Sequence, residues 1–254
     1  MNRGKREAGR GKRALAVGLL TTVVLACSKG PDKVSDSAAT TPTAESTDSA
    51  RSPASRFPLA ASRKTVLFAG TSLTAGLGLE PDSAYPMLIQ RSIDSAGLPF
   101  EVVNAGVSGE TSSGLLDRLD WLLRGNFAVM VIETGANDGL RGIPASTLRG
   151  NLEAVLDRIK AKRPDARVVL VQMEALPNLG PKYTTDFHRL YAEVAKEKGV
   201  PLLPFLLQGV AGRRDLNQAD GIHPNYTGER IVAQNVWKGL KPILDSLDRG
   251  DNSR

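Results

Sequence analysis

Lys64–Leu79 reads KTVLFAGTSLTAGLGL, and the rest of the chain is interpreted outward from this stretch. The short apolar run at 65–69 predicts a buried β-strand, and the glycine-rich residues after it predict a turn. A single serine, Ser72, stands in that turn. Two later stretches, NAGVSGET at 104–111 and DGIHP at 220–224, carry the other polar residues that a reacting serine requires.

From Lys64 onward, short apolar runs alternate with segments of helical periodicity. Alternation of this kind is typical of a parallel sheet with helices on both faces, where ligands bind beyond the carboxyl ends of the strands. We therefore expect an α/β fold, a three-layer α/β/α sandwich in which Ser72, Gly109 and Asn137 follow strands at one edge. The expected strands are 65–69, 100–103, 127–133, 167–172 and 201–204, and the expected helices are 82–96, one opening at Thr111 or Ser112, 146–162, 181–198 and 225–247.

The first 63 residues differ from the remainder in composition. A basic segment, 1–13, precedes an apolar run at 14–26, which is shorter than the roughly 18 residues expected of a membrane-spanning helix. VLAC, ending at Cys27, resembles a bacterial lipoprotein signal, which implies export to the cell envelope, periplasmic or outer-membrane associated, and a lipid anchor on Cys27. An ordinary secretory signal with an incidental cysteine is the alternative.

Domain boundaries follow from that interpretation. Residues 1–26 are the expected signal peptide, and 27–63, rich in Ser, Thr, Ala and Pro, are an expected flexible linker that cannot bury enough apolar surface to fold. Residues 64–248 are the expected folded domain, followed by a disordered tail at 249–254.

Composition excludes several classes of function. The chain has 254 residues and a net charge of +6, but residues 1–26 hold six basic residues and one acidic residue. The remainder is therefore close to neutral, and its charge gives no support to a nucleic-acid partner. The single cysteine excludes an intrachain disulfide and a multi-cysteine metal site.

Ser72 needs a base to act as a nucleophile, and the chain has only two histidines. His188 lies in an expected helix, where a surface or packing role is the simpler interpretation. His223 lies in a loop bounded by Gly and Pro, with Asp220 three residues earlier. A turn at Gly221 lets the carboxylate hold one ring N–H, which leaves the other nitrogen for the serine proton. Alternatively, Asp220 and His223 only cap the last helix.

A tetrahedral intermediate also needs hydrogen-bond donors for its oxyanion. The candidates are the backbone N–H groups of Ser72 and Gly109 and the side-chain amide of Asn137, which follows a strand of entirely apolar character. Each of these residues is also common in turns, so turn chemistry is the alternative for each one alone.

Taken together, these blocks resemble the SGNH, or GDSL-type, hydrolase superfamily over residues 64–247. GTSL at 70–73, Gly109, GAND at 135–138 and DGIHP at 220–224 match its four blocks in order. The resemblance is closest to the bacterial thioesterase/lysophospholipase/arylesterase branch. It implies a flavodoxin-like fold, a catalytic triad of Ser72, Asp220 and His223, an oxyanion hole of Ser72, Gly109 and Asn137, and no metal or organic cofactor.

One residue departs from the family pattern. Thr71 stands where the first block usually has an acid. A threonine hydroxyl can still bond local backbone, and we expect Thr71→Asp to change the rate far less than loss of Ser72.

The function predicted from sequence is hydrolysis of an ester or thioester, including lysophospholipid. The loop at 173–181 and the segment at 209–216 are the predicted walls of the acyl pocket. Three alternatives are a carbohydrate O-acetyl esterase, a non-catalytic binding lipoprotein on the same fold, and a metal-dependent hydrolase. The last lacks an H-E-x-x-H motif and closely spaced histidines.

Overall fold

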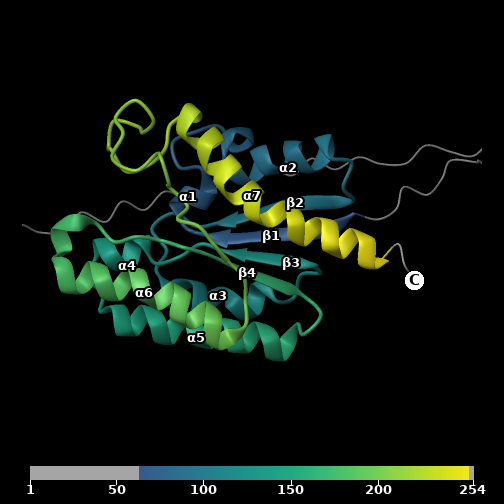
Figure 1. Cartoon of the computed structure of the whole chain (residues 1–254), viewed down its shortest axis with the longest axis horizontal. Coiled ribbons are helices and arrows are strands. Elements are labelled where there is room, and N and C mark those ends of the chain that lie inside the picture. Colours follow the sequence, from purple (N-terminus) through teal and green to yellow (C-terminus); the bar gives the residue numbers. More distant parts are fainter. Residues whose placement is uncertain (1–62, 252–254) are drawn as a thin grey trace, which may run out of the picture. The chain divides into compact units, whose positions relative to one another are not determined.

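The computed structural model describes residues 63–251 (Figure 1). The predicted signal peptide, Cys27 and all of the predicted linker except Arg63 lie outside these residues, so those assignments stay predictions. The strands are β1 (Lys64–Gly70), β2 (Phe100–Gly106), β3 (Val129–Ile132), β4 (Arg167–Val171) and β5 (Leu202–Leu203). The helices are α1 (Ser72–Ala75), α2 (Tyr85–Ser95), α3 (Ser112–Leu122), α4 (Ala136–Leu140), α5 (Ala145–Lys162), α6 (Pro181–Lys198) and α7 (Tyr226–Asp251), with 3₁₀ turns η1 (Pro81–Ser83) and η2 (Pro177–Leu179).

The five strands form one sheet in the order β2-β1-β3-β4-β5, and every neighbouring pair is parallel. Helices α2 and α7 pack together on one face, while α3, α5 and α6 pack on the other (Figure 1). This arrangement confirms the predicted three-layer α/β/α fold with the flavodoxin-like strand order.

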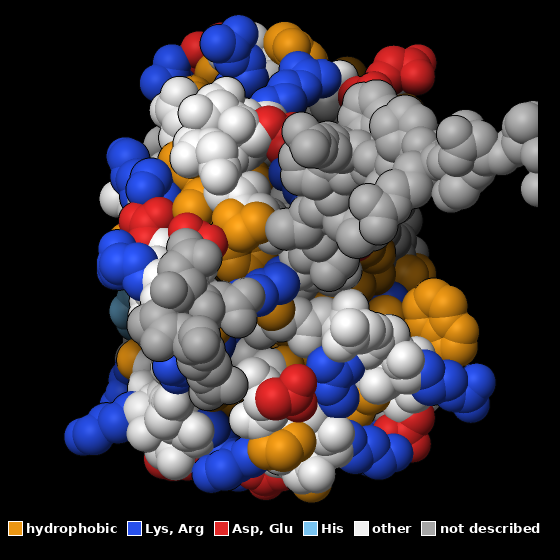
Figure 2. All heavy atoms as spheres, turned by 90° about the vertical axis from the view of Figure 1, so that its right-hand side faces the viewer, with side chains coloured by type: hydrophobic (Ala, Val, Ile, Leu, Met, Phe, Trp, Pro, Cys, Tyr) orange, Lys and Arg blue, Asp and Glu red, His pale blue; other side chains and the backbone are white. Residues whose placement is uncertain are grey.

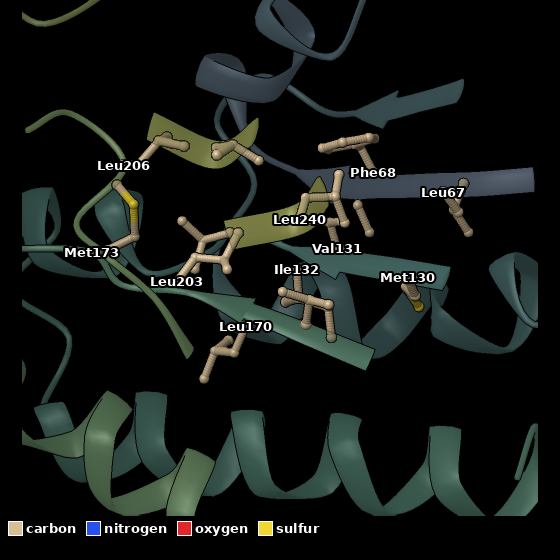
Figure 3. Close-up of a cluster of buried hydrophobic side chains, with 14 of the residues drawn as sticks. Leu67, Phe68, Met130, Val131, Ile132, Leu170, Met173, Leu203, Leu206 and Leu240 are labelled. Atoms are coloured by element: carbon tan, nitrogen blue, oxygen red, sulfur yellow. The ribbon is translucent and has the colours of Figure 1, made fainter. Parts of the chain in front are cut away.

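The core lies on both faces of the central strands. Four consecutive residues of β3 are buried, as expected for a strand covered on both sides. Their side chains meet those of β1, β4, β5 and α7 in one continuous apolar cluster (Figure 3), which includes Phe68, Val131, Ile132, Leu203 and Leu240. A rigid sheet of this kind fixes the loops at its edge.

Several element boundaries differ from the predicted ones. Strand β2 continues to Gly106, and α7 continues to Asp251, so the predicted boundary at 248 falls inside a helix. Two short helices, α1 and α4, occupy segments that the sequence analysis treats as a turn and a loop. Each is about one turn long, too short to show helical periodicity.

Helix α2 begins at Tyr85, one to two residues later than an N-cap at Asp82 or Ser83 would place it, and the N–H of its first residue has a distant partner. The sequence predicts Asp82 or Ser83 as the N-cap, but no side chain caps the helix from the residues before it. Instead, Glu229 of α7 accepts the Tyr85 N–H at 2.7 Å. A side-chain carboxyl oxygen at the helix N-terminus satisfies this orphan donor as a local cap would.

No helix within residues 63–251 combines the length and apolarity needed to cross a membrane.

Candidate active site

Ser72 is the first residue of α1, directly beyond the carboxyl end of β1. Its hydroxyl oxygen lies 2.8 Å from Nε2 of His223, although the two residues are 151 positions apart. The other ring nitrogen of His223, Nδ1, lies 2.7 Å from Oδ2 of Asp220. The structure thus brings together the three residues that the sequence analysis proposes as a triad.

Asp220 is held as a carboxylate by the turn that it begins. Its Oδ1 accepts the N–H groups of Ile222 and His223 at 2.9 and 3.0 Å, and Gly221 adopts the positive φ of 71° that this turn needs. The hydrogen bond from the Ile222 N–H, which has the largest effect, and the one from the His223 side chain lower the pKa of Asp220 to about 2. Because an ionised carboxylate only accepts hydrogen bonds, Nδ1 of His223 donates to Asp220, and in the neutral imidazole Nε2 is then the nitrogen that accepts from the Ser72 hydroxyl.

The capping alternative for these residues does not hold. Asn225 caps α7, because its Oδ1 accepts the N–H groups of Thr227 and Gly228. His188, the other histidine, lies on α6 with 65% of its side chain exposed and contacts Glu174. Its position agrees with the surface role favoured from sequence.

The predicted oxyanion residues belong to two loops that are tied to each other. Asn137, in α4, donates its side-chain amide to the Glu110 carbonyl at 2.9 Å, which uses one of its two amide hydrogens. Arg141 of the same helix region donates to the Gly109 carbonyl at 2.8 Å. Gly109 has a φ of 80°, a conformation that favours glycine.

Further contacts connect that pair of loops to the serine. The Glu110 carboxylate forms a two-pronged ion pair with Arg118, at 2.5 and 2.7 Å, and only 5% of the glutamate side chain is exposed. The N–H of Val107 donates to the Gly70 carbonyl at 2.8 Å, two residues before Ser72. The Ser72 N–H, at the first position of α1, has no acceptor inside its own helix and is available to a ligand.

Buried Asp138, the last residue of the GAND block, completes this framework. Its carboxylate accepts the Ser112 N–H at 2.9 Å and the Ser112 hydroxyl at 2.5 Å. The N-terminus of α3 is therefore fixed to α4, and Gly109 is fixed with it.

Thr71 makes the local backbone bond expected from sequence, because its hydroxyl accepts the Leu73 N–H at 3.4 Å and caps α1. Its second contact could not be inferred from sequence. Its hydroxyl lies 3.0 Å from both carboxylate oxygens of Glu133, and its N–H donates to Glu133 Oε2 at 2.8 Å. Glu133 is the residue that follows β3, and it is fully buried. The sequence signal for this contact was an acidic residue at the end of an apolar strand. In the structure the Glu133 side chain points into the protein rather than to solvent.

The predicted pocket walls are only partly available to a ligand. In the segment 209–216, Val210 and Leu216 are buried in the core and cannot form an open wall. In the loop 173–181, Leu176 is 43% exposed. A cavity of about 770 Å³ lies between this loop and the N-terminal parts of α5 and α6, and its lining includes no member of the triad.

The described part of the chain contains no group of three or more His, Cys, Asp or Glu residues placed to hold a metal ion.

Sequence comparison now places the chain in a family. The profile of the GDSL-like lipase/acylhydrolase family matches residues 68–231, which include Ser72, Gly109, Asn137 and the Asp220–His223 turn. The chain belongs to this family. It is an enzyme that hydrolyses ester bonds, as the sequence resemblance implies.

Individual relatives of this GDSL-like hydrolase agree with that placement. Esterase TesA of Pseudomonas aeruginosa is 41% identical over 185 residues, which cover 72% of this chain and 91% of TesA. Thioesterase 1/protease 1/lysophospholipase L1 of Escherichia coli K12 is 36% identical over 187 residues, covering 73% and 88%. The crystal structure of the psychrotrophic esterase EstA from Pseudoalteromonas sp., inhibited by monoethylphosphonate, matches with a TM-score of 0.68 and 33% identity, covering 72% of this chain and 99% of EstA.

Proposed function

We propose that this enzyme is a serine esterase that hydrolyses carboxylic esters or thioesters through Ser72, His223 and Asp220. The observation that carries the proposal is the 2.8 Å contact between the Ser72 hydroxyl and Nε2 of His223, with Asp220 on the opposite ring nitrogen. A hydroxyl becomes an effective nucleophile at neutral pH only when a base is positioned to take its proton.

The geometry supports a two-step reaction. Ser72 Oγ attacks the carbonyl carbon while its proton moves to Nε2 of His223, and Asp220 stabilises the imidazolium that results. The oxyanion accepts hydrogen bonds from the Ser72 and Gly109 N–H groups and the Asn137 amide. The proton then passes from Nε2 to the departing alcohol or thiol. Water next attacks the acyl-serine with the same histidine as base, and the proton returns to Ser72.

An apolar acyl or aryl group is the substrate portion that fits this edge of the sheet. The loops beyond the carboxyl ends of the strands, and the loop that carries His223, expose large apolar side chains, which a polar substrate would not cover. The relatives named above as an esterase and as a thioesterase and lysophospholipase support the same class. These exposed residues are Leu77, Val107, Leu140, Leu176 and Ile222.

Hydrolysis of p-nitrophenyl esters of increasing acyl length tests this proposal. We expect activity on acetyl and longer esters, and a loss of about a thousandfold or more in Ser72→Ala. A rate that falls sharply beyond acetyl would instead favour an O-acetyl esterase. Unchanged hydrolysis by Ser72→Ala would refute the role of Ser72.

We also propose, from sequence alone, that the enzyme is exported and anchored in the cell envelope by a lipid on Cys27. Metabolic labelling with a radioactive fatty acid should modify the wild-type protein and not Cys27→Ser. Equal labelling of both would contradict the anchor.

A further inference from the structure

The buried carboxylate of Glu133 contacts both sides of the nucleophile. It accepts hydrogen bonds from the N–H and the hydroxyl of Thr71, the residue before Ser72. It also accepts a hydrogen bond from the Thr74 hydroxyl, in α1, at 2.9 Å. Within residues 63–251, all of its side-chain hydrogen bonds come from backbone or hydroxyl donors rather than from a cation. The reaction steps described above do not use this buried carboxylate, although it lies near the reacting serine and is held only by neutral hydrogen-bond donors.

The approach of the chain to this carboxylate is very close at Gly70. A Cβ atom placed there would lie 2.1 Å from Thr74 Oγ1 and 2.7 Å from Glu133 Oε2. No side chain can be accommodated without displacing these atoms. The end of β1 is therefore shaped around the contact between Glu133 and α1.

The network continues to the side of the site that carries the histidine. The hydroxyl oxygen of Tyr85, in α2, lies 2.9 Å from the hydroxyl oxygen of Thr74. The backbone N–H of Tyr85 donates to Glu229. Glu229 belongs to the first turn of α7, the helix that follows the His223 loop. The titratable groups that face Glu133 from neighbouring elements are thus Tyr85 of α2, Glu229 of α7 and Tyr191 of α6.

We propose that Glu133 is a positioning residue for Ser72. Because Thr71 bonds Glu133 through a hydroxyl, this contact does not require a proton shared between two carboxyl groups. A threonine hydroxyl donates to the carboxylate whether or not any other group titrates. An acid at position 71 would put two carboxyl groups in contact, and one of them would have to stay protonated for the loop to keep its shape. The proposal rests on the proposed function, because the position of Ser72 matters only if Ser72 attacks the substrate.

The test is the second-order rate at which a fluorophosphonate modifies Ser72, measured beside kcat and KM for p-nitrophenyl acetate. We expect Thr71→Val to lower the labelling rate and kcat by about tenfold to a hundredfold, with KM changed by less than about threefold. Thr71→Ser should restore the labelling rate to within about threefold of wild type. Glu133→Gln, which weakens the same contact, should fall in the range of Thr71→Val.

Thr134→Val is the matched control. Thr134 is also buried, stands next to Glu133, and its hydroxyl has no hydrogen-bond partner in the described structure. The labelling rate of this variant should stay within about twofold of wild type, because no positioning contact is removed.

A pH series separates positioning from a purely structural effect. Thr71→Asp should be active near neutral pH and lose its labelling rate as the pH rises and the shared proton is released, whereas Thr71→Asn should not acquire this alkaline loss. Matching pH profiles for the two variants would overturn the claim about the proton.

The outcomes distinguish the two proposals. Wild-type enzyme that is not labelled at Ser72 overturns the proposed function. Wild-type enzyme that is labelled, together with folded Thr71→Val and Glu133→Gln that are labelled at the same rate, overturns the positioning role alone. If Glu133→Gln does not fold, the comparison of Thr71→Val, Thr71→Ser and Thr134→Val decides the question.

Discussion

Replacing Glu229 by glutamine should change how the stability of the protein depends on pH. Only 1% of Glu229 is exposed, and its Oε2 accepts the Tyr85 N–H at 2.7 Å. Burial raises the pKa of its carboxyl to about 8, the Tyr85 hydrogen bond opposes that shift, and the charge of Glu133 adds to it. Glutamine has the same shape, keeps an acceptor for Tyr85 and cannot ionise.

The direction and size of the effect follow from proton linkage. Between pH 4.5 and 8, the folded protein holds a proton at Glu229 that the unfolded chain has released, so raising the pH lowers the free energy of unfolding. One proton corresponds to about 1.4 kcal/mol per pH unit. From pH 6 to pH 8, wild type should therefore lose about 2 kcal/mol relative to Glu229→Gln. The difference in Tm between wild type and Glu229→Gln should therefore widen by about 4–8 °C from pH 6 to pH 8 for a domain of this size.

Urea unfolding followed by far-UV circular dichroism at pH 6, 7 and 8 measures this difference. Glu80→Gln is the control, because Glu80 is exposed and makes no side-chain cap, and its difference from wild type should not vary with pH. A Glu229→Gln difference that is the same at all three pH values would refute the reasoning. It would mean that Glu229 ionises equally in the folded and unfolded states.

Three further predictions concern the site and its support. Asn137→Ala should lower kcat about 10²–10³-fold in steady-state ester hydrolysis, since it removes an oxyanion donor; a change below threefold would count against that role. Asp220→Asn should lower kcat by about 10²–10⁴-fold across the pH range, because the amide favours the wrong histidine tautomer; a wild-type rate would show that Asp220 does not orient the ring. Gly70→Ala should lower the free energy of unfolding by about 1–3 kcal/mol in urea titrations, because its Cβ collides with Thr74. Gly150→Ala, on α5 with open space around it, should raise that free energy by about 0.5–1 kcal/mol, and a loss similar to that of Gly70→Ala would contradict the steric explanation.

The parts of the fold that follow from local pattern were predictable. The apolar runs gave the strands of the parallel sheet in the correct order along the chain, and the helical spacing in α5 and α6 gave boundaries within one residue. Ser72, Asp220 and His223 could be proposed because a parallel sheet brings loops from distant parts of the chain to one edge. On the face shown in Figure 2, Lys and Arg side chains lie mainly around the margin, with a few Asp and Glu side chains among them.

The support beneath the site depends on contacts that have no local signature. Glu133 ends an apolar strand, and nothing near it in sequence shows that it bonds Thr71, which is 62 positions away. The start of α2 is fixed by Glu229, 144 positions away from Tyr85. Glu229 takes the place of a local cap at α2, whereas α1 keeps its local cap from Thr71 and is held by Glu133 in addition. Such long-range contacts become visible only when the chain is folded.

The most direct test of the account is to find which atom a fluorophosphonate modifies. Peptide mapping of the labelled wild-type enzyme by mass spectrometry should place the adduct on Ser72, with complete loss of ester hydrolysis, and Ser72→Ala should take up no label. An adduct on another residue, with hydrolysis retained by Ser72→Ala, would contradict the central claim that Ser72 attacks the substrate.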